Sequence, residues 1–523
     1  MTRSLPGIVL LTGLFLLSGC TSVQAGVSIP SVFSDHMVLQ RDMKVPVWGN
    51  AEPGEAIAVA FEKQTLRTKA DEKGYWRVDL APLTASLEPR EMTVSGSKDK
   101  IVLHDVLVGD VWICSGQSNM NIGVQADELA KANLPNLRFF NVSQTTSQSP
   151  MNNIGGRWAM CAAGVDTSCT AAGFYFGKAL HARYSIPIGL LHASKSGTVC
   201  EGWTPRDVVE GDADLKPILD RWESQAKAYD GAKAQAEYDT AKAEFDKKYA
   251  EWERENAAAK AAGKPKPRRP KPPMKKIDPR EQADFPGNLY NGMIAPLMPF
   301  AIRGVVWYQG ESNTDRAWQY RKLFPALIRS WRARWGQGDF PFLFVQLPSR
   351  RSGWEPNEPS EWAELREAQM MALREPNTGM AITIDSGGIL HPDNKPLVGA
   401  RLELVARHLV YGENIVYSGP LYKSSETRDD TVVLHFDYVG SGLVAKGERL
   451  DGFVVAGADR KFVLADAKIV GDTVEVHADG VTEPQAVRYA WGREPPVTLF
   501  NAEGLPASPF RTDDWPGATY EKR

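Results

Sequence analysis

Residues 26–107 alternate short apolar stretches with turn residues. Three of these stretches are residues 44–49, 56–60 and 76–80, and the pair Pro53-Gly54 separates the first two. Apolar runs of this length, divided by Pro and Gly, are typical of the strands of a small β-sandwich. The pattern therefore predicts an N-terminal β-sandwich domain over residues 26–107.

After residue 108 the pattern changes to apolar, strand-like runs that alternate with longer amphipathic ones. This alternation is typical of a parallel sheet with helices on both faces. We therefore predict an α/β domain with a parallel sheet over residues 108–411. The expected strands are residues 110–114, 186–192, 302–308, 342–347 and 379–384, and the expected helices are residues 172–184 and 396–410.

Residues 212–284 interrupt this domain with a different composition. Aromatic side chains such as Phe245, Tyr249 and Trp252 recur at steps of three, four and seven residues on an Ala/Lys/Glu background. This spacing predicts one or two long helices with a narrow aromatic seam. The insertion is either a lid or partner-binding hairpin, or a hairpin that packs back on its own domain, which we expect. The Pro/Lys/Arg run at residues 264–276 predicts an extended basic spacer, either a solvated linker or a segment that binds acidic glycans.

Short alternating strands return beyond residue 412. Residues 431–436 and 473–476 alternate apolar and polar positions, as half-buried strands do. The chain therefore ends in a second β-rich region, predicted over residues 412–523.

The first 25 residues have the pattern of an export signal. A basic start at Arg3 precedes an apolar run at residues 8–17, which is too short to span a bilayer. Leu17-Ser18-Gly19-Cys20 is typical of a lipoprotein signal, in which the Cys20 thiol is acylated and anchors the protein. Cleavage after Val23-Gln24-Ala25 is the alternative. We predict an exported protein, either a periplasmic or outer-membrane lipoprotein anchored at Cys20 or a secreted protein.

Charge and cysteine spacing limit the partners. A formal net charge of −3, with both signs mixed along the chain, offers no broad basic face, so no nucleic-acid partner is expected. The four cysteines after the signal lack the CxxC or Cys/His spacing of zinc sites, so no metal is expected. Cys161 and Cys169 could close a small loop as a disulfide. Alternatively all four, with Cys114 and Cys200, are small buried apolar residues.

Two predicted strands end in turns that carry polar side chains. The first turn is Gly116-Gln117-Ser118-Asn119, which puts a hydroxyl at the carboxyl end of a strand, where open α/β sheets bind ligands. Ser118 is placed like a nucleophile, although Ser and Asn also cap helices after tight turns. The second turn is Gly310-Glu311-Ser312-Asn313, where the Asn313 side chain and the Gly310 backbone N–H could face the same oxyanion.

A histidine follows the last predicted strand of the sheet. His391 precedes the helix at residues 396–410 and belongs to the same sheet end as Ser118, where a general base must lie to reach a serine hydroxyl. Among the eight histidines only His192 has a comparable context, since it also ends a strand. We therefore predict that His391 is the general base.

These three segments, in this order and spacing, resemble the sialate O-acetylesterase family within the SGNH-type serine hydrolases. The resemblance extends to residues 31–41, to Glu201-Gly202-Trp203, and to residues 365–369 and 399–402. It covers nearly all of the chain after the signal, apart from the helical insertion.

The resemblance implies a three-layer α/β/α SGNH-hydrolase core with a parallel sheet, flanked by β-sandwich-like N- and C-terminal regions, with no metal and no cofactor. Ser118 would carry the acyl group and His391 would activate it. The Ser118 backbone N–H, Gly197 and Asn313 match the positions of the oxyanion hole. The family usually has two consecutive glycines where this chain has Ser196-Gly197.

The acid of a catalytic triad is the main departure from the family pattern. SGNH enzymes commonly have an Asp two or three residues before the histidine, and these positions are Ile389 and Gly388 here. Asp385, six residues upstream of His391, completes a triad if the loop folds back. Otherwise Asp385 is a turn residue and a backbone carbonyl holds the imidazole in a Ser/His dyad.

The resemblance implies a serine esterase that removes O-acetyl groups from sugars, either sialic acids or plant polysaccharides such as xylan. A sialate site should present an arginine to the sugar carboxylate, and Arg366 and Arg401 are candidates by residue type. The missing Asp keeps a second hypothesis open, a catalytically weak or inactive surface protein that binds carbohydrate. Lipase or protease activity is disfavoured, because no Gly-x-Ser-x-Gly motif surrounds Ser118.

Overall fold

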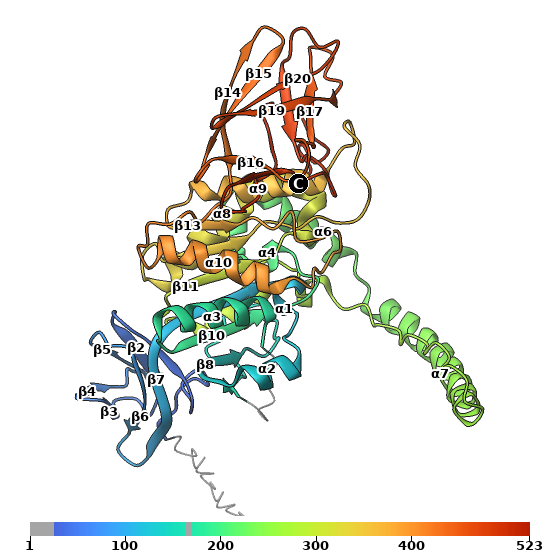
Figure 1. The fold of residues 1–523 in the computed structure, drawn as a ribbon. Helices are drawn as coiled ribbons and strands as arrows, with labels where there is room; N and C mark the ends of the chain where they lie inside the picture. Colours follow the sequence, from blue (N-terminus) through green and yellow to red (C-terminus); the bar gives the residue numbers. More distant parts are fainter. Residues whose placement is uncertain (1–25, 163–168) are drawn as a thin grey trace, which may run out of the picture.

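A mixed sheet forms the centre of the molecule. The computed structural model describes residues 26–162 and 169–523, so the predicted signal with Cys20 lies outside the described residues. The sheet has the order β13-β12-β11-β7-β10-β8-β9 (Figure 1), and all neighbours pair in parallel except β8 and β9. The strands are β7 (Lys100–Gly116), β8 (Leu134–Asn141), β9 (Trp158–Cys161), β10 (Ile188–Ser194), β11 (Gly304–Tyr308), β12 (Phe342–Val345) and β13 (Thr378–Ala381).

Helices cover both faces of this sheet. In β11, Val305 and Trp307 pack in the core on the side of α8, whereas Val306 and Tyr308 pack in a second core with α3 and α10. Successive side chains of a strand alternate between its faces, so a strand buried on both faces is apolar throughout. The predicted three-layer α/β/α core is confirmed. Its helices are α1 (Ser118–Asn121), α2 (Ala126–Ala132), α3 (Ala171–Tyr184), α4 (Cys200–Trp203), α5 (Arg206–Glu210), α8 (Ala317–Trp335), α9 (Glu361–Met371) and α10 (Lys395–Leu409).

The N-terminal region forms an extension of the core sheet through β7 and, apart from it, a two-stranded sheet. Strand β6 pairs with the first part of β7 and carries β3 and β4 beside it, whereas β2 and β5 pair antiparallel and form the other sheet. Strand β7 does not end at the predicted boundary near residue 107, because Val106 pairs with β6 and Asp110 pairs with β10. The remaining strands are β1 (Val38–Gln40), β2 (Val45–Asn50), β3 (Ala56–Phe61), β4 (Gln64–Lys69), β5 (Tyr75–Leu80) and β6 (Ser86–Ser95).

The insertion contains two helices with different surroundings. Helix α6 (Lys216–Ala228) buries Ile218 and Leu219 in the main core. Helix α7 (Gly231–Ala261) extends away from the body of the molecule (Figure 1), and its buried residues are few. The expectation that the insertion packs back on its own domain therefore holds for α6 and is wrong for α7.

The basic spacer packs against the aromatic seam of α7. The Trp252 indole N–H donates to the carbonyl oxygen of Pro267 at 2.9 Å. The Arg269 guanidinium lies 5.1 Å from the centroid of the Tyr249 ring. The segment is extended, as predicted, and it supplies the apolar and cationic contacts that the rest of the domain does not give this helix.

The C-terminal region is β-rich, as predicted. It contains two four-stranded sheets, in the orders β14-β15-β20-β19 and β18-β17-β21-β23, and the pair β16-β22. Its strands are β14 (Leu421–Arg428), β15 (Thr431–Asp437), β16 (Leu443–Ala445), β17 (Phe453–Ala456), β18 (Val463–Leu464), β19 (Asp466–Val470), β20 (Thr473–His477), β21 (Ala486–Tyr489), β22 (Leu499–Asn501) and β23 (Phe510–Arg511).

The described cysteines are free. Cys114, Cys161, Cys169 and Cys200 are buried and unpaired, so the alternative of a Cys161–Cys169 disulfide is wrong. Burial raises the pKa of the Cys114 thiol to about 12, which keeps it protonated. Within residues 26–162 and 169–523, no three His, Cys, Asp or Glu side chains gather so as to hold a metal ion. In the same part of the chain no helix combines the length and apolar character that a membrane crossing requires.

A buried carboxylate joins the N-terminal region to the sheet. Asp110 is fully buried in β7 and accepts hydrogen bonds from Gln40 at 2.9 Å, from Arg41 at 3.0 Å and from the Tyr411 hydroxyl at 2.9 Å. Arg303, which precedes β11, lies 2.8 Å from the same carboxylate. Burial would raise the pKa of Asp110, but the two guanidinium groups outweigh it and lower the pKa. Asp110 is therefore ionised and paired.

Asp110→Asn should lower the free energy of unfolding by about 3–5 kcal/mol at neutral pH, because it removes a fully buried carboxylate charge from two partly buried guanidinium groups. Urea denaturation measures this loss. Asp42→Asn is the matched control, since this half-exposed carboxylate contacts the same Arg41 and Arg303 and should contribute less than about 1 kcal/mol.

The loss should also depend on pH. Folding lowers the pKa of Asp110, so its stabilisation is present above the pKa of an unfolded Asp and is lost as the pH falls through the folded value. The difference in free energy of unfolding between the wild type and Asp110→Asn should therefore become smaller in acid. The same difference in free energy of unfolding at every pH would contradict the stabilisation by an ionised Asp110.

Candidate active site

Ser118 lies where β7 ends at the carboxyl edge of the sheet. Gly116 has a φ of +135°, and a Cβ there would come within 2.1 Å of the Tyr308 carbonyl oxygen, so only glycine fits this turn. Ser118 is then the first residue of α1. The N–H of a first helical residue has no partner within its helix. Both the hydroxyl and the N–H of Ser118 are therefore at the sheet edge.

His391 contacts Ser118 directly. The imidazole Nε2 lies 2.9 Å from the Ser118 Oγ. The imidazole belongs to the loop between β13 and α10 and is exposed. With Nε2 unprotonated, the serine hydroxyl donates to it, which is the arrangement that lets a histidine take the serine proton.

Asp385 is bound elsewhere. Its carboxylate accepts two hydrogen bonds from the Arg401 guanidinium of α10, at 2.5 and 2.8 Å. Among the described residues, no carboxylate forms an ion pair or hydrogen bond with His391. This geometry contradicts the expected Asp385–His391 pair. The physical reason is competition, because a two-point guanidinium pair is among the strongest contacts a carboxylate makes.

A buried amide connects the serine to the histidine loop. Asn119 is fully buried, and its Nδ2 donates to Glu311 Oε1 at 2.5 Å and to the carbonyl oxygen of Leu390 at 3.0 Å. The Lys395 ammonium donates to the Asn119 Oδ1 at 2.6 Å. Because Leu390 precedes His391, this amide sets the position of the imidazole relative to the serine.

Sequence reasoning missed Asn119, Glu311 and Lys395 as site residues. Each is close in sequence to a residue that it did identify, next to Ser118, two residues before Asn313 and four after His391. A lysine and a glutamate in polar loops are normally solvated, so the residue types gave no reason to expect a buried network. Only the neighbouring ends of β7 and β11 bring these side chains together.

Burial shifts the ionisation of this network. Burial raises the pKa of Glu311 and lowers the pKa of Lys395 to about 8. For His391, partial burial lowers the pKa, and the positive charge of Lys395 lowers it further. The imidazole is therefore neutral at neutral pH, which is the form that a general base needs.

Asn313 is held rigidly beneath the loop that follows β10. Its Oδ1 accepts from the Cys200 backbone N–H at 2.8 Å and from the Gln309 amide at 2.7 Å. Its Nδ2 donates to Glu201 Oε2 at 2.9 Å. An amide nitrogen carries two hydrogens, so one Asn313 N–H remains for a further acceptor.

Gly197 lies in the loop after β10, beside the end of β7. It has a φ of +76°, with open space where a Cβ would be. The loop is fixed on both sides, because the Lys195 N–H donates to the Gly116 carbonyl at 3.1 Å and the Val199 N–H donates to Asp284 Oδ1 at 3.1 Å. Burial raises the pKa of Asp284 to about 6. The loops that carry Ser118 and Gly197 thus follow neighbouring strand ends.

A polar pocket of about 310 Å³ adjoins α1 at the same edge. Amide and hydroxyl side chains line it, among them Asn121, Gln144 and Ser194. His192, the other histidine considered as a base, belongs to this pocket, and its Nε2 lies 2.6 Å from the Ser194 Oγ. His192 therefore forms its hydrogen bond inside the pocket. The histidine that contacts the Ser118 hydroxyl is His391.

The two arginines considered for a substrate carboxylate are already bound. Arg366 is fully buried and donates to the carbonyl oxygens of Leu347, Pro348 and Gly492 at 2.7–2.8 Å. Arg401 holds Asp385. Neither guanidinium is free to bind an anion, so both expectations are wrong. Residue type alone does not indicate whether a guanidinium is used inside the fold.

Removing the Lys395 charge should change the pH dependence of catalysis. In Lys395→Met the neighbouring positive charge that lowers the pKa of His391 is absent, so the acid limb of kcat/KM should move to higher pH. The measurement is a pH–rate profile with a soluble acetyl ester. Lys178→Met, on an exposed position of α3, should leave the limb in place. An unmoved acid limb in Lys395→Met would show that Lys395 does not influence the base.

Known proteins resemble this chain over most of its length. The sequence model of the family described as carbohydrate esterase, sialic acid-specific acetylesterase, matches residues 277–397. The sialate O-acetylesterase of Mus musculus is 30% identical over 83% of this chain and 82% of its own length. The sialate O-acetylesterase of Rattus norvegicus is 30% identical over 95% of this chain and 97% of its own length.

A solved structure shares the fold. The crystal structure of a carbohydrate acetylesterase from Xanthomonas citri superposes with a TM-score of 0.77 at 36% identity, covering 94% of this chain and all of that one. The likeness thus includes the flanking β-rich regions as well as the central sheet. The chain therefore belongs to the sialate O-acetylesterase family and is a carboxylic ester hydrolase.

Proposed function

We propose that this protein removes O-acetyl groups from sugars through an acyl-enzyme formed on Ser118. The observation that carries the proposal is the 2.9 Å contact between the Ser118 hydroxyl and the His391 imidazole at the carboxyl edge of the sheet. A nucleophile and a base in hydrogen-bond contact are the minimum requirement for serine acyl transfer. The names of the relatives, sialate O-acetylesterase and carbohydrate acetylesterase, support the same chemistry.

In the first half of the reaction, His391 takes the Ser118 proton as Oγ attacks the acetyl carbonyl carbon. The backbone N–H groups of Ser118 and Gly197, with the free Nδ2 hydrogen of Asn313, stabilise the oxyanion of the tetrahedral intermediate. The carbon–oxygen bond to the sugar then breaks, and His391 returns the proton to the leaving sugar hydroxyl. Water activated by His391 releases acetate in the second half.

The base acts in a Ser/His dyad. The carboxylate of Asp385 is taken by Arg401, so the imidazole is oriented through its loop by the bond between Asn119 and the Leu390 carbonyl. His391 is exposed, and water can solvate the imidazolium that forms during the reaction. The role of Asp385 is to hold the start of this loop against α10.

The substrate is an acetylated carbohydrate, either a sialic acid or a plant polysaccharide such as xylan. The polar pocket beside α1 supports sugar binding, because its amides and hydroxyls suit sugar hydroxyl groups. The leader pattern supports export, as a periplasmic or outer-membrane lipoprotein anchored at Cys20 or as a secreted enzyme.

A catalytically weak or inactive carbohydrate-binding protein is the second candidate. The observation that favours it is the absence of a carboxylate partner for His391 among the described residues. A dyad is slower than a full triad, since no carboxylate stabilises the positive charge on the imidazolium.

Replacing the nucleophile tests the proposed function. Purified wild type should release acetate from O-acetylated sialic acid or from acetylated xylan, and Ser118→Ala should lower kcat by at least about 10³-fold. Ser149→Ala, an exposed serine of another loop, should leave the rate unchanged. The better of the two substrates identifies the sugar class. No release from either by the wild type would support the binding-protein alternative.

Asp385→Asn separates the dyad from a triad. The substitution weakens the pair with Arg401 and should lower the melting temperature, but kcat should fall by less than about tenfold at a temperature where the variant is folded. His391→Ala should lower kcat about as much as Ser118→Ala does. A loss near 10⁴-fold in Asp385→Asn, as expected for a triad acid, would exclude the dyad.

A further inference from the structure

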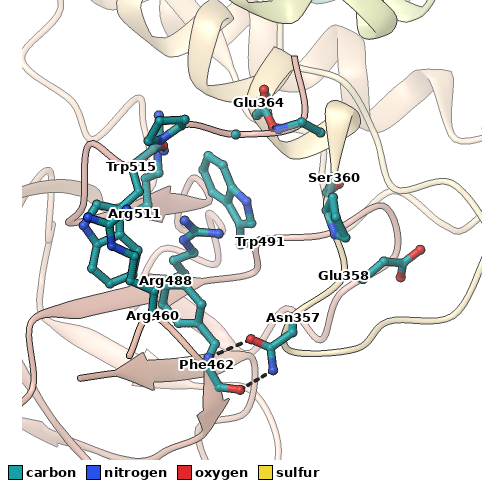
Figure 2. A pocket seen from close by; sticks show the side chains of 14 residues that line it. Asn357, Glu358, Ser360, Glu364, Arg460, Phe462, Arg488, Trp491, Arg511 and Trp515 are labelled. Carbon is teal, nitrogen blue, oxygen red and sulfur yellow. Dashed lines mark hydrogen bonds between the residues drawn. The ribbon is translucent and has the colours of Figure 1, made fainter. Parts of the chain in front are cut away.

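A second pocket lies between the C-terminal region and the loop that follows β12. Its volume is about 450 Å³. Figure 2 shows aromatic and arginine side chains of the C-terminal region on one wall and the segment from Asn357 to Ser360 on the opposite wall. The residues used below are Glu358, Arg460, Phe462, Trp491 and Trp515. The residues of the esterase site are not among those that line it.

Two arginines of the pocket belong to its wall. The Arg488 guanidinium makes two hydrogen bonds of 2.8 Å to Asp513 and lies 4.2 Å from the centroid of the Phe462 ring. Arg511 is paired with Glu367 at 2.8 Å. Paired charges of this kind stiffen the wall and do not attract a free anion.

Other polar groups of the pocket have no protein partner. Among the described residues, the Arg460 guanidinium contacts no carboxylate and lies over the Trp515 ring, 5.1 Å from the centroid. Glu358 on the opposite wall is exposed and forms no ion pair with any described residue. The indole N–H groups of Trp491 and Trp515 make no hydrogen bond to any described residue. The pocket thus offers hydrogen-bond donors from Arg460 and the two indoles and an acceptor from Glu358. Arg460 and Glu358 carry opposite charges.

The two walls are fixed to one another. The Asn357 amide forms a two-point contact with the Phe462 backbone, donating to its carbonyl at 2.6 Å and accepting from its N–H at 2.7 Å (Figure 2). On the upper side, Glu364 of α9 accepts from the N–H groups of Ala518 and Thr519 at 2.6 and 3.0 Å. A ligand therefore meets a preformed cavity and has little ordering cost to overcome.

We propose that this pocket binds a neutral sugar residue of a glycan chain, at a site separate from the esterase site. A pyranose ring has apolar C–H faces that pack on aromatic rings, and hydroxyl groups that both donate and accept hydrogen bonds. The pocket supplies the partly exposed ring of Trp515 for the former, since Trp491 and Phe462 are each only 5% exposed, and Arg460, Glu358 and the indole N–H groups for the latter. The opposite charges of Arg460 and Glu358 favour an uncharged ligand over an acidic one.

The pocket is connected to the loop of His391 by one short segment. Arg351 donates its backbone N–H to the Gly388 carbonyl at 2.5 Å, three residues before His391. The same segment reaches the pocket at Asn357, and Ser352 is held on the way by Glu494 of the C-terminal region at 3.0 Å. A polysaccharide that binds in the pocket through one sugar residue stays on the protein while its other, acetylated sugar residues reach the catalytic serine.

Binding without hydrolysis tests the proposal. Isothermal titration and saturation-transfer NMR would measure binding of xylohexaose and cellohexaose, which carry no acetyl groups, with N-acetylneuraminic acid as the acidic comparison. The full-length protein should bind a neutral hexasaccharide, and Trp515→Ala should bind it at least about tenfold more weakly. Arg460→Ala, at an exposed position where folding is not at risk, should also weaken binding.

Controls separate this site from catalysis. Tyr75→Ala removes an aromatic ring that is 40% exposed in the N-terminal region and should bind like the wild type. Trp515→Ala should keep the wild-type rate on p-nitrophenyl acetate and lose rate on acetylated polymer at low concentration.

Three outcomes would overturn the proposal. They are no binding of either hexasaccharide, equal binding by the wild type, Trp515→Ala and Arg460→Ala, or Arg460-dependent binding of N-acetylneuraminic acid alone, which would mark an acidic ligand. Failure of the esterase proposal appears separately, as absence of acetate release.

Discussion

The parallel pairing of β7 with β10 and β11 is the constraint on which the site depends. Ser194 pairs with Gly116 and Tyr308 pairs with Gly116, so three strands end at the same level of the sheet. Each strand is followed by a loop that carries part of the proposed machinery. Parallel strands place their carboxyl ends at one edge, and residues that are far apart in the sequence meet there without any local signal.

The chemistry at this edge is supported by charges that the fold has buried. Lys395, Asn119 and Glu311 form a polar chain behind the serine and the histidine, in an environment that destabilises both charged ends. Burying such groups has a cost in free energy, which the hydrogen bonds through Asn119 partly offset. As a result, the His391 imidazole is neutral and lies in contact with the Ser118 hydroxyl. In this site a backbone carbonyl and an amide perform the orienting task that a carboxylate performs in a triad.

The C-terminal region contributes more than a cover for the sheet. Glu494 and Gly492 contact the loop and helix that follow β12, and Arg366 of that helix is enclosed by carbonyl oxygens from both parts of the chain. These contacts fix the loop that lies between the histidine segment and the aromatic pocket. By contrast, α7 extends from the body, and its aromatic seam is covered by the basic segment that follows it.

The sequence by itself determined the α/β core, the β-rich flanks, the family, and the two residues Ser118 and His391 that the structure brings into contact. Apolar periodicity and glycine turns are local properties, so they can be recognised without coordinates. It did not identify β8, where Pro135 and Asn136 interrupt the apolar pattern, or the free extension of α7. Only the tertiary structure decided that Asp385 pairs with Arg401, that Arg366 donates to carbonyl oxygens inside the fold, and that Lys395 is buried in contact with the amide that Glu311 accepts from. The physical reason is that the partner of a charged group is set by the packing of distant elements, and a linear pattern does not contain that information.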